Sequence, residues 1–161
     1  MGRGEVIGAC LGPPCSSWGT AADRGPGGAI RSSRFPWGLP CNELSPRQNA
    51  RLKLGNDLFH ATLELMRTLA KKRLPMILEH PINSRIWHTQ ELVALLRQYN
   101  GQVAILDQCR LGTRWRKRTK LAFFFVHPND IAKFERRFTN AGGRCVRTLR
   151  PHLILQGSAG R

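Results

Sequence analysis

Lys120-Leu121-Ala122-Phe123-Phe124-Phe125-Val126 is the stretch of sequence that decides the fold. Its apolar residues are consecutive, so both faces of an extended chain would be buried. A strand that is buried on both faces lies inside a sheet whose two sides are covered, usually by helices. We therefore expect residues 120–126 to form the central strand of an α/β domain.

Outward from this strand, strands and helices alternate along the chain. Short apolar runs predict three further strands, at residues 5–11, 74–78 and 102–107. Helical spacing and capping residues predict helices over 47–72, over 86–99 and from Asn129 or Asp130 to about Phe138. The alternation predicts a single domain over residues 1–161 with a three-layer α/β sandwich. Residues 12–46, rich in Gly, Pro, Ser and Arg, are expected to form one long loop.

The charge of the chain points to a polyanionic partner. There are 26 Lys and Arg residues against 10 Asp and Glu residues, a formal net charge of +16. Such an excess favours nucleic acid, through neutralisation of phosphates and release of counterions. A basic surface without a partner, or a ribosome-associated fragment, is the alternative.

Cysteine usage and hydropathy bear on where the protein is found. The five cysteines form no Cys-x-x-Cys pair, which argues against a disulfide framework and for a reduced intracellular compartment, nucleus or cytoplasm. No apolar stretch approaches 18 residues, so we expect no membrane span. The first residues lack a hydrophobic signal region.

Two short motifs place reactive groups where predicted strands end. Gly12-Pro13-Pro14-Cys15 follows one apolar run, and Glu79 follows another. Chemistry in open α/β sheets collects at the carboxyl ends of strands, so Cys15 and Glu79 are the candidate catalytic residues. Cys15 would be a thiol nucleophile, or else a small buried hydrophobe. Glu79 would hydrogen-bond a base such as cytosine, or else form an ion pair.

The segment 108–119 predicts contact with nucleic acid. It ends in a dense basic run around one tryptophan, which suits phosphate contact together with stacking on a base. The candidate nucleic-acid-binding residues are Arg114, Trp115, Lys117 and Lys120. A solvated basic loop is the alternative interpretation.

A metal site is not expected from the sequence. Cys145 and His152, combined with Cys109 or His127, match no common zinc spacing.

The ordered blocks Gly12-Pro13-Pro14-Cys15, Glu79 and Gly112 with Arg116-Lys117-Arg118 resemble the C5-cytosine DNA methyltransferases. A longer string, including Trp37-Gly38-Leu39-Pro40, resembles methyltransferase-like segments of retroelement-type polyproteins. The resemblance implies that the sheet is part of a Rossmann-like methyltransferase sheet. It also implies that Cys15 attacks C6 of cytosine, that Glu79 binds the base, and that Pro14, Arg116 and Arg118 contact the substrate.

The same resemblance implies S-adenosylmethionine as cofactor and DNA rather than RNA as partner. In this family a Gly-x-Gly strand and loop precede the Pro-Cys block, and no such block is found before Val6. We therefore expect the chain alone to bind the cofactor poorly and to be inactive without a separate cofactor-binding domain. A non-catalytic nucleic-acid-binding module is the alternative function, and a translated remnant without a selected function is a third.

Overall fold

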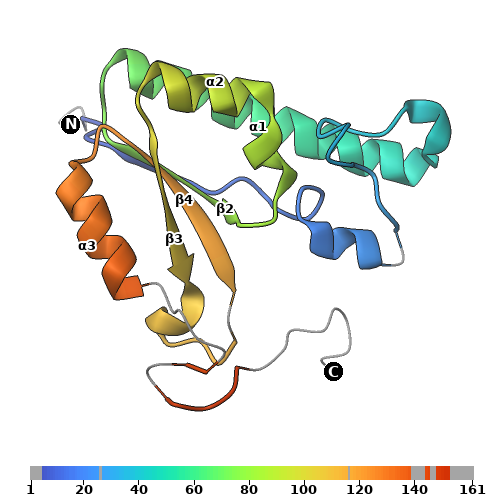
Figure 1. The fold of residues 1–161 in the computed structure, drawn as a ribbon. Coiled ribbons are helices and arrows are strands. Elements are labelled where there is room, and N and C mark those ends of the chain that lie inside the picture. Colours follow the sequence, from blue (N-terminus) through green and yellow to red (C-terminus); the bar gives the residue numbers. More distant parts are fainter. Residues whose placement is uncertain (1–4, 26, 116, 139–143, 146–147, 153–161) are drawn as a thin grey trace.

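The computed structural model describes residues 5–25, 27–115, 117–138, 144–145 and 148–152. Within these residues a four-stranded sheet packs against three α-helices (Figure 1). The sheet has the order β1-β2-β4-β3. Its strands are β1 (Ala9–Leu11), β2 (Met76–Pro81), β3 (Gln102–Asp107) and β4 (Arg118–Phe124). The expected α/β class is confirmed.

The sheet is mixed rather than wholly parallel. β1 pairs with β2 in parallel, whereas β4 is antiparallel to both β2 and β3. Consequently β1, β2 and β3 run in one direction, with the reversed strand β4 between β2 and β3. The carboxyl ends of β1, β2 and β3 and the start of β4 therefore share one edge of the sheet, which we call the carboxyl edge.

Helices cover both faces of this sheet. Alternate residues of β2 and β4 join one apolar cluster with α1 (Pro46–Lys71) and α2 (Gln90–Gln98). The intervening residues, such as Leu121 and Phe123, pack with Ile131 and Phe134 of α3 (Pro128–Phe138). The continuous apolar run of β4 is thus explained, because both of its faces are buried, as the sequence predicted.

The first strand is shorter and more exposed than expected. Only Ala9–Leu11 pair with β2, and the side chains of Val6 and Ile7 are 63% and 83% exposed. The prediction of a buried strand over 5–11 was wrong. β1 lies at the end of the sheet, so in the described part of the chain it has a neighbour on one side only.

The strand predicted at 74–78 lies two to three residues further along, at 76–81. Arg73 has φ 53°, and the Leu74 amide donates to the carbonyl of Leu69, so both residues belong to the C-terminal cap of α1. Glu79 therefore lies inside β2, opposite Leu121, rather than after the strand.

The other elements follow the prediction closely. Ser45 caps α1, its side chain and that of Gln48 form a capping box, and Pro46 is the first helical residue. The region expected as a helix over 86–99 is split into the 3-10 turn Arg85–His88 and α2. The long loop is confirmed, with two short 3-10 turns at Thr20–Arg24 and Cys41–Glu43.

Candidate functional site

The loop that carries Cys15 continues along β2 after β1 has ended. Leu11 pairs with Leu78, so Gly12 comes next to Glu79, and a Cβ at Gly12 would lie 3.6 Å from Glu79 Oε2. Pro13 is buried, whereas Pro14 and Cys15 are exposed. The structure therefore brings the Gly-Pro-Pro-Cys loop to the strand that bears Glu79 and leaves the thiol of Cys15 open to solvent.

A buried tryptophan fixes the turn that presents Cys15. The carbonyl of Cys15 accepts hydrogen bonds from the amides of Trp18 and Gly19, at 3.1 and 3.0 Å. The Trp18 side chain is fully buried, and its Nε1 donates to the carbonyl of Gly55 in α1 at 3.1 Å. Trp37 packs edge-on against Trp18 at 5.3 Å between ring centroids. These two tryptophans therefore anchor the loop to α1.

Arg31 completes this anchor, and its side chain is buried. Its guanidinium stacks 3.5 Å from the centre of the Trp18 ring and donates to Ser17 and to the carbonyl of Pro36. Burial, together with the neighbouring charges of Arg85 and Arg51, lowers the pKa of Arg31 to about 9. The acceptors that the described residues offer are neutral oxygens, so Arg31 acts here as a structural cation.

Glu79 presents a carboxylate that its surroundings do not fully satisfy. The side chain is half-buried, and Oε1 is buried without a hydrogen-bond partner among the described residues. A buried acceptor without a partner costs roughly 1–3 kcal/mol, and more when it is charged. An oxygen of this kind is suited to a donor that arrives with a ligand, such as the amino group of a base.

His80 is a site residue that the sequence did not single out. It is fully buried, on the opposite face of β2 from Glu79, and the carbonyls of Pro13 and Pro14 face its ring. Burial first, and then the charge of Lys117, lowers the pKa of His80 to about 4, against the opposing effect of the two carbonyls. The imidazole is therefore neutral at pH 7, and it lies next to the backbone of the Pro-Pro-Cys loop.

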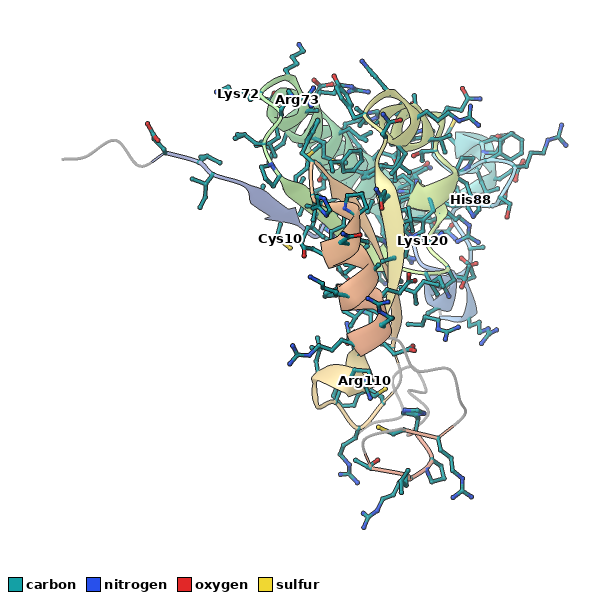
Figure 2. All side chains as sticks on the ribbon, turned by 60° about the vertical axis from the view of Figure 1, so that its left-hand side comes forward. Cys10, Lys72, Arg73, His88, Arg110 and Lys120 are labelled. Atoms are coloured by element: carbon teal, nitrogen blue, oxygen red, sulfur yellow. The ribbon has the colours of Figure 1, made fainter. Side chains whose placement is uncertain are left out.

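At the carboxyl edge, two of the predicted basic residues lie against other side chains, and the other described ones are exposed or half-buried. Arg118 Nε lies 3.2 Å from Oδ1 of the fully buried Asp107, and Lys120 lies over the Trp87 ring, 5.1 Å from its centre. Lys120 is labelled in Figure 2, and burial lowers its pKa. Arg114 is exposed, whereas Trp115 and Lys117 are half-buried.

Arg116, the other predicted substrate contact, lies outside the described residues. The Ile82 amide donates to the carbonyl of Arg118 at 3.2 Å, so the basic segment is joined directly to the end of β2.

An arginine-lined cavity lies beside the Cys15 turn and was not predicted. It has a volume of about 740 Å³, and its lining includes Ser16, Gly27, Arg47 and Arg51. Arg51 Nη2 donates to the carbonyl of Ser16, the residue after Cys15, at 3.2 Å. The sequence signal would have been a pair of arginines four positions apart, which share a helix face.

Comparison with protein-family models, with curated proteins and with solved structures finds no match to this chain. The site is therefore interpreted from its own geometry. In the described part of the chain no helix is both long and apolar enough to cross a membrane.

The described residues do not fit S-adenosylmethionine. Such a cofactor is held by a glycine loop between a strand and a helix, with an acidic residue at the next strand end. The glycines that line the cavity, Gly25, Gly27 and Gly28, follow a 3-10 turn, not a strand, and the nearby side chains are the cations Arg47 and Arg51. This lining suits an anion, so no step is derived through the cofactor.

Proposed function

We propose that this chain is a nucleic-acid-binding domain in which Cys15 adds to C6 of a cytosine base while Glu79 hydrogen-bonds that base. The observation that carries the proposal is the position of the Cys15 turn. The turn begins three residues after Gly12, which adjoins the under-satisfied carboxylate of Glu79, and its Ser16 lines the cavity together with Arg47 and Arg51. Nucleophile, base contact and phosphate contact are thereby offered by adjoining segments.

The addition step needs only groups that this site supplies. The Cys15 thiol loses its proton to solvent, and the thiolate sulfur forms a bond to C6. The electrons of the C5–C6 double bond move to C5, which takes a proton from water. Reversal of these steps exchanges the hydrogen on C5 and returns the thiol. Glu79 would hold the base by accepting from its amino group.

The sheet supports the further proposal that this domain is the target-base half of a Rossmann-like methyltransferase sandwich. Three strands run in one direction and one reversed strand lies between two of them, and mixed sheets are common in α/β folds. Helices occupy both faces, and the proposed site lies at the carboxyl edge, where ligands bind in such sheets.

A covalent trap tests the proposal directly. An oligonucleotide with pyrimidin-2-one in place of one cytosine accepts a thiolate readily, and we expect a protein–DNA adduct that survives denaturation. Cys15→Ser should abolish the adduct but leave reversible binding intact. Cys10→Ser, which changes another exposed cysteine, should form the adduct normally. An adduct that persists in Cys15→Ser would contradict the assignment.

The arginine cavity favours a second candidate, a non-catalytic nucleic-acid-binding module. Arg47 and Arg51 need no contribution from Cys15 to bind phosphates. We expect affinity for DNA to fall steeply with salt, with a log–log slope of about −0.9 per phosphate contacted. Arg47→Gln combined with Arg51→Gln should reduce that slope by about two.

A matched control removes two charges elsewhere on the surface. Arg97 and Arg136 are exposed on α2 and α3. The Arg97→Gln, Arg136→Gln double variant should change the slope less, although the net charge is the same. Equal slopes in the two double variants would show that the cavity is not a phosphate site.

A further inference from the structure

Three soft ligand groups from distant parts of the sequence meet below the carboxyl edge. The Sγ atoms of Cys109 and Cys145 and one ring nitrogen of His152 lie within 4.8 Å of one another. Cys109 is fully buried, Cys145 is 4% exposed, and His152 is half-buried. The sequence predicted no metal site because these residues match no common spacing, and the fold removes that objection by bringing them together.

The backbone positions each ligand by a defined turn. Cys109 lies on the 3-10 turn η4 (Gln108–Leu111), which follows β3 and is closed by Gly112, with φ 108°. Cys145 opens a second turn, in which its amide donates to the carbonyl of Arg150 at 3.0 Å. Arg144 pairs with Pro151 across that turn, so Cys145 and His152 both lie at its base. Figure 1 shows this segment next to η4.

In the last described segment, the side chains that are shielded from solvent are those of the candidate ligands. Among residues 144–145 and 148–152, only Cys145 and His152 are not exposed, and Leu149 is 72% exposed. Within these described residues, Cys145 and His152 are therefore the two side chains that are shielded from solvent, and both belong to the cluster with Cys109.

We propose that Cys109, Cys145 and His152 bind a zinc ion, with a water molecule or another ligand in the fourth position. Two thiolates and one imidazole form a soft donor set that selects zinc over magnesium or calcium. Ligand atoms about 2.3 Å from one tetrahedral ion are roughly 3.8 Å apart, so side-chain movements of about 1 Å suffice.

The charge of the site also fits its surroundings. Two thiolates balance the two charges of the ion, so an occupied site adds no net charge to a strongly basic chain. Arg110, next to Cys109 in this turn, donates from Nε to the carbonyl of Arg137 at 2.9 Å, which holds one guanidinium at the turn (Figure 2).

Zinc in this position would join the segment 144–152 to the end of β3. Cys109 is five residues before Arg114, so the ion would also hold one end of the basic segment that leads into β4. This inference is independent of the proposed reaction at Cys15, which lies at the opposite side of the sheet, at the end of β1.

Cobalt substitution tests the site in the full chain. Protein freed of metal by a chelator and kept reduced is titrated with Co²⁺, and we expect one equivalent to produce the absorption of tetrahedral thiolate coordination. Zn²⁺ should displace it. Cys145→Ser and His152→Gln should each weaken binding by more than about tenfold. Cys41→Ser, at an exposed cysteine outside the cluster, should bind as the parent does.

Proteolysis supplies a second readout. Trypsin cleaves after Arg144, an exposed residue directly before Cys145, and Zn²⁺ should slow this cleavage in the parent but not in His152→Gln. Identical cobalt spectra for the parent and Cys145→Ser would overturn the proposal. The proposal would also be overturned if no stoichiometric metal binding were found. The same holds if Cys109 and Cys145 formed a disulfide that the reductant does not break.

Discussion

At the scale of single residues, the roles of two neighbours in the site depend on which face of the sheet each side chain occupies. Glu79 and His80 are neighbours in β2, so their side chains lie on opposite faces of the sheet. Glu79 was predicted from its place after an apolar run. His80 was not, because its importance comes from the loop that crosses it, and that contact joins residues more than 60 positions apart.

The depressed pKa of His80 predicts a specific loss of stability in acid. In the unfolded chain His80 binds a proton near pH 6.5, and in the folded chain only near pH 4. The contribution of His80 to the free energy of unfolding is therefore fully present above about pH 6.5. It is lost as the pH falls toward 4. By pH 5 the parent should have lost about 2 kcal/mol through this group.

Urea unfolding at pH 7 and pH 5 measures that loss. His80→Gln keeps a neutral side chain in the same place, and we expect its stability to fall less between the two pH values, by about the same 2 kcal/mol. All other groups are identical in the two proteins, so their contributions to the pH dependence cancel in the comparison. Equal losses in parent and variant would mean that His80 is protonated normally in the folded state.

At the scale of elements, Gly55 shows how tertiary packing reverses a local preference. Gly55 lies inside α1, where alanine would favour the helix by about 1 kcal/mol. A Cβ at Gly55, however, would lie 2.1 Å from Ser17 Oγ and 3.0 Å from Arg31 Nη2. The close approach lets the Cys15 loop pack against the helix, so the low helix propensity of glycine describes only part of the role of Gly55.

We therefore expect Gly55→Ala to destabilise the protein by about 1–3 kcal/mol. Ala61→Gly, at an exposed position of the same helix, should cost about 1 kcal/mol through propensity alone. Thermal unfolding of both variants, and of Gly55→Ala combined with Ser17→Gly, makes the comparison. A stabilised Gly55→Ala variant would show that the loop does not pack against α1 in this way.

The elements themselves were mostly predictable from local pattern. The long helix α1, the strand at 102–107 and the doubly apolar strand β4 follow from spacing and composition within one segment. Strand β1 was overestimated, because exposure at a sheet edge depends on which neighbours are present. The arginine cavity and the Cys109–Cys145–His152 cluster could not be predicted, since each joins separate segments through loops without a periodic pattern.

At the scale of the whole molecule, segments that are far apart in the sequence meet at the carboxyl edge. The Cys15 loop, the end of β2, the turn η4 and the basic start of β4 all reach this edge because three strands run toward it and one leaves it. A nucleic-acid strand along the edge would meet a thiol, a carboxylate and several cations in succession. Strand β1 ends this array, and within the described residues its outer side carries no partner strand.

That arrangement predicts a division between addition and methyl transfer. Under the proposed function, addition to C6 needs a thiol and a group that holds the base, and Cys15 and Glu79 would supply them. Methyl transfer needs a donor carbon held in line, about 3–3.5 Å from C5, and such positioning supplies much of the acceleration. The described residues offer no glycine loop between a strand and a helix beside β1 that would hold the donor.

We therefore expect the 161 residues alone to show no binding of S-adenosylmethionine by calorimetry at millimolar ligand. They should show slow exchange of the C5 hydrogen of cytosine that does not depend on the cofactor. Tritium release from C5-labelled DNA measures the exchange, and Cys15→Ser should abolish it because the bond to C6 can no longer form. Incorporation of labelled methyl groups by the purified chain would contradict the division, since it would require a cofactor site built from the loop that follows Cys15. A separate cofactor-binding domain, added in trans, is expected to permit methylation only if it can dock beside β1, whose outer side has no partner strand among the described residues.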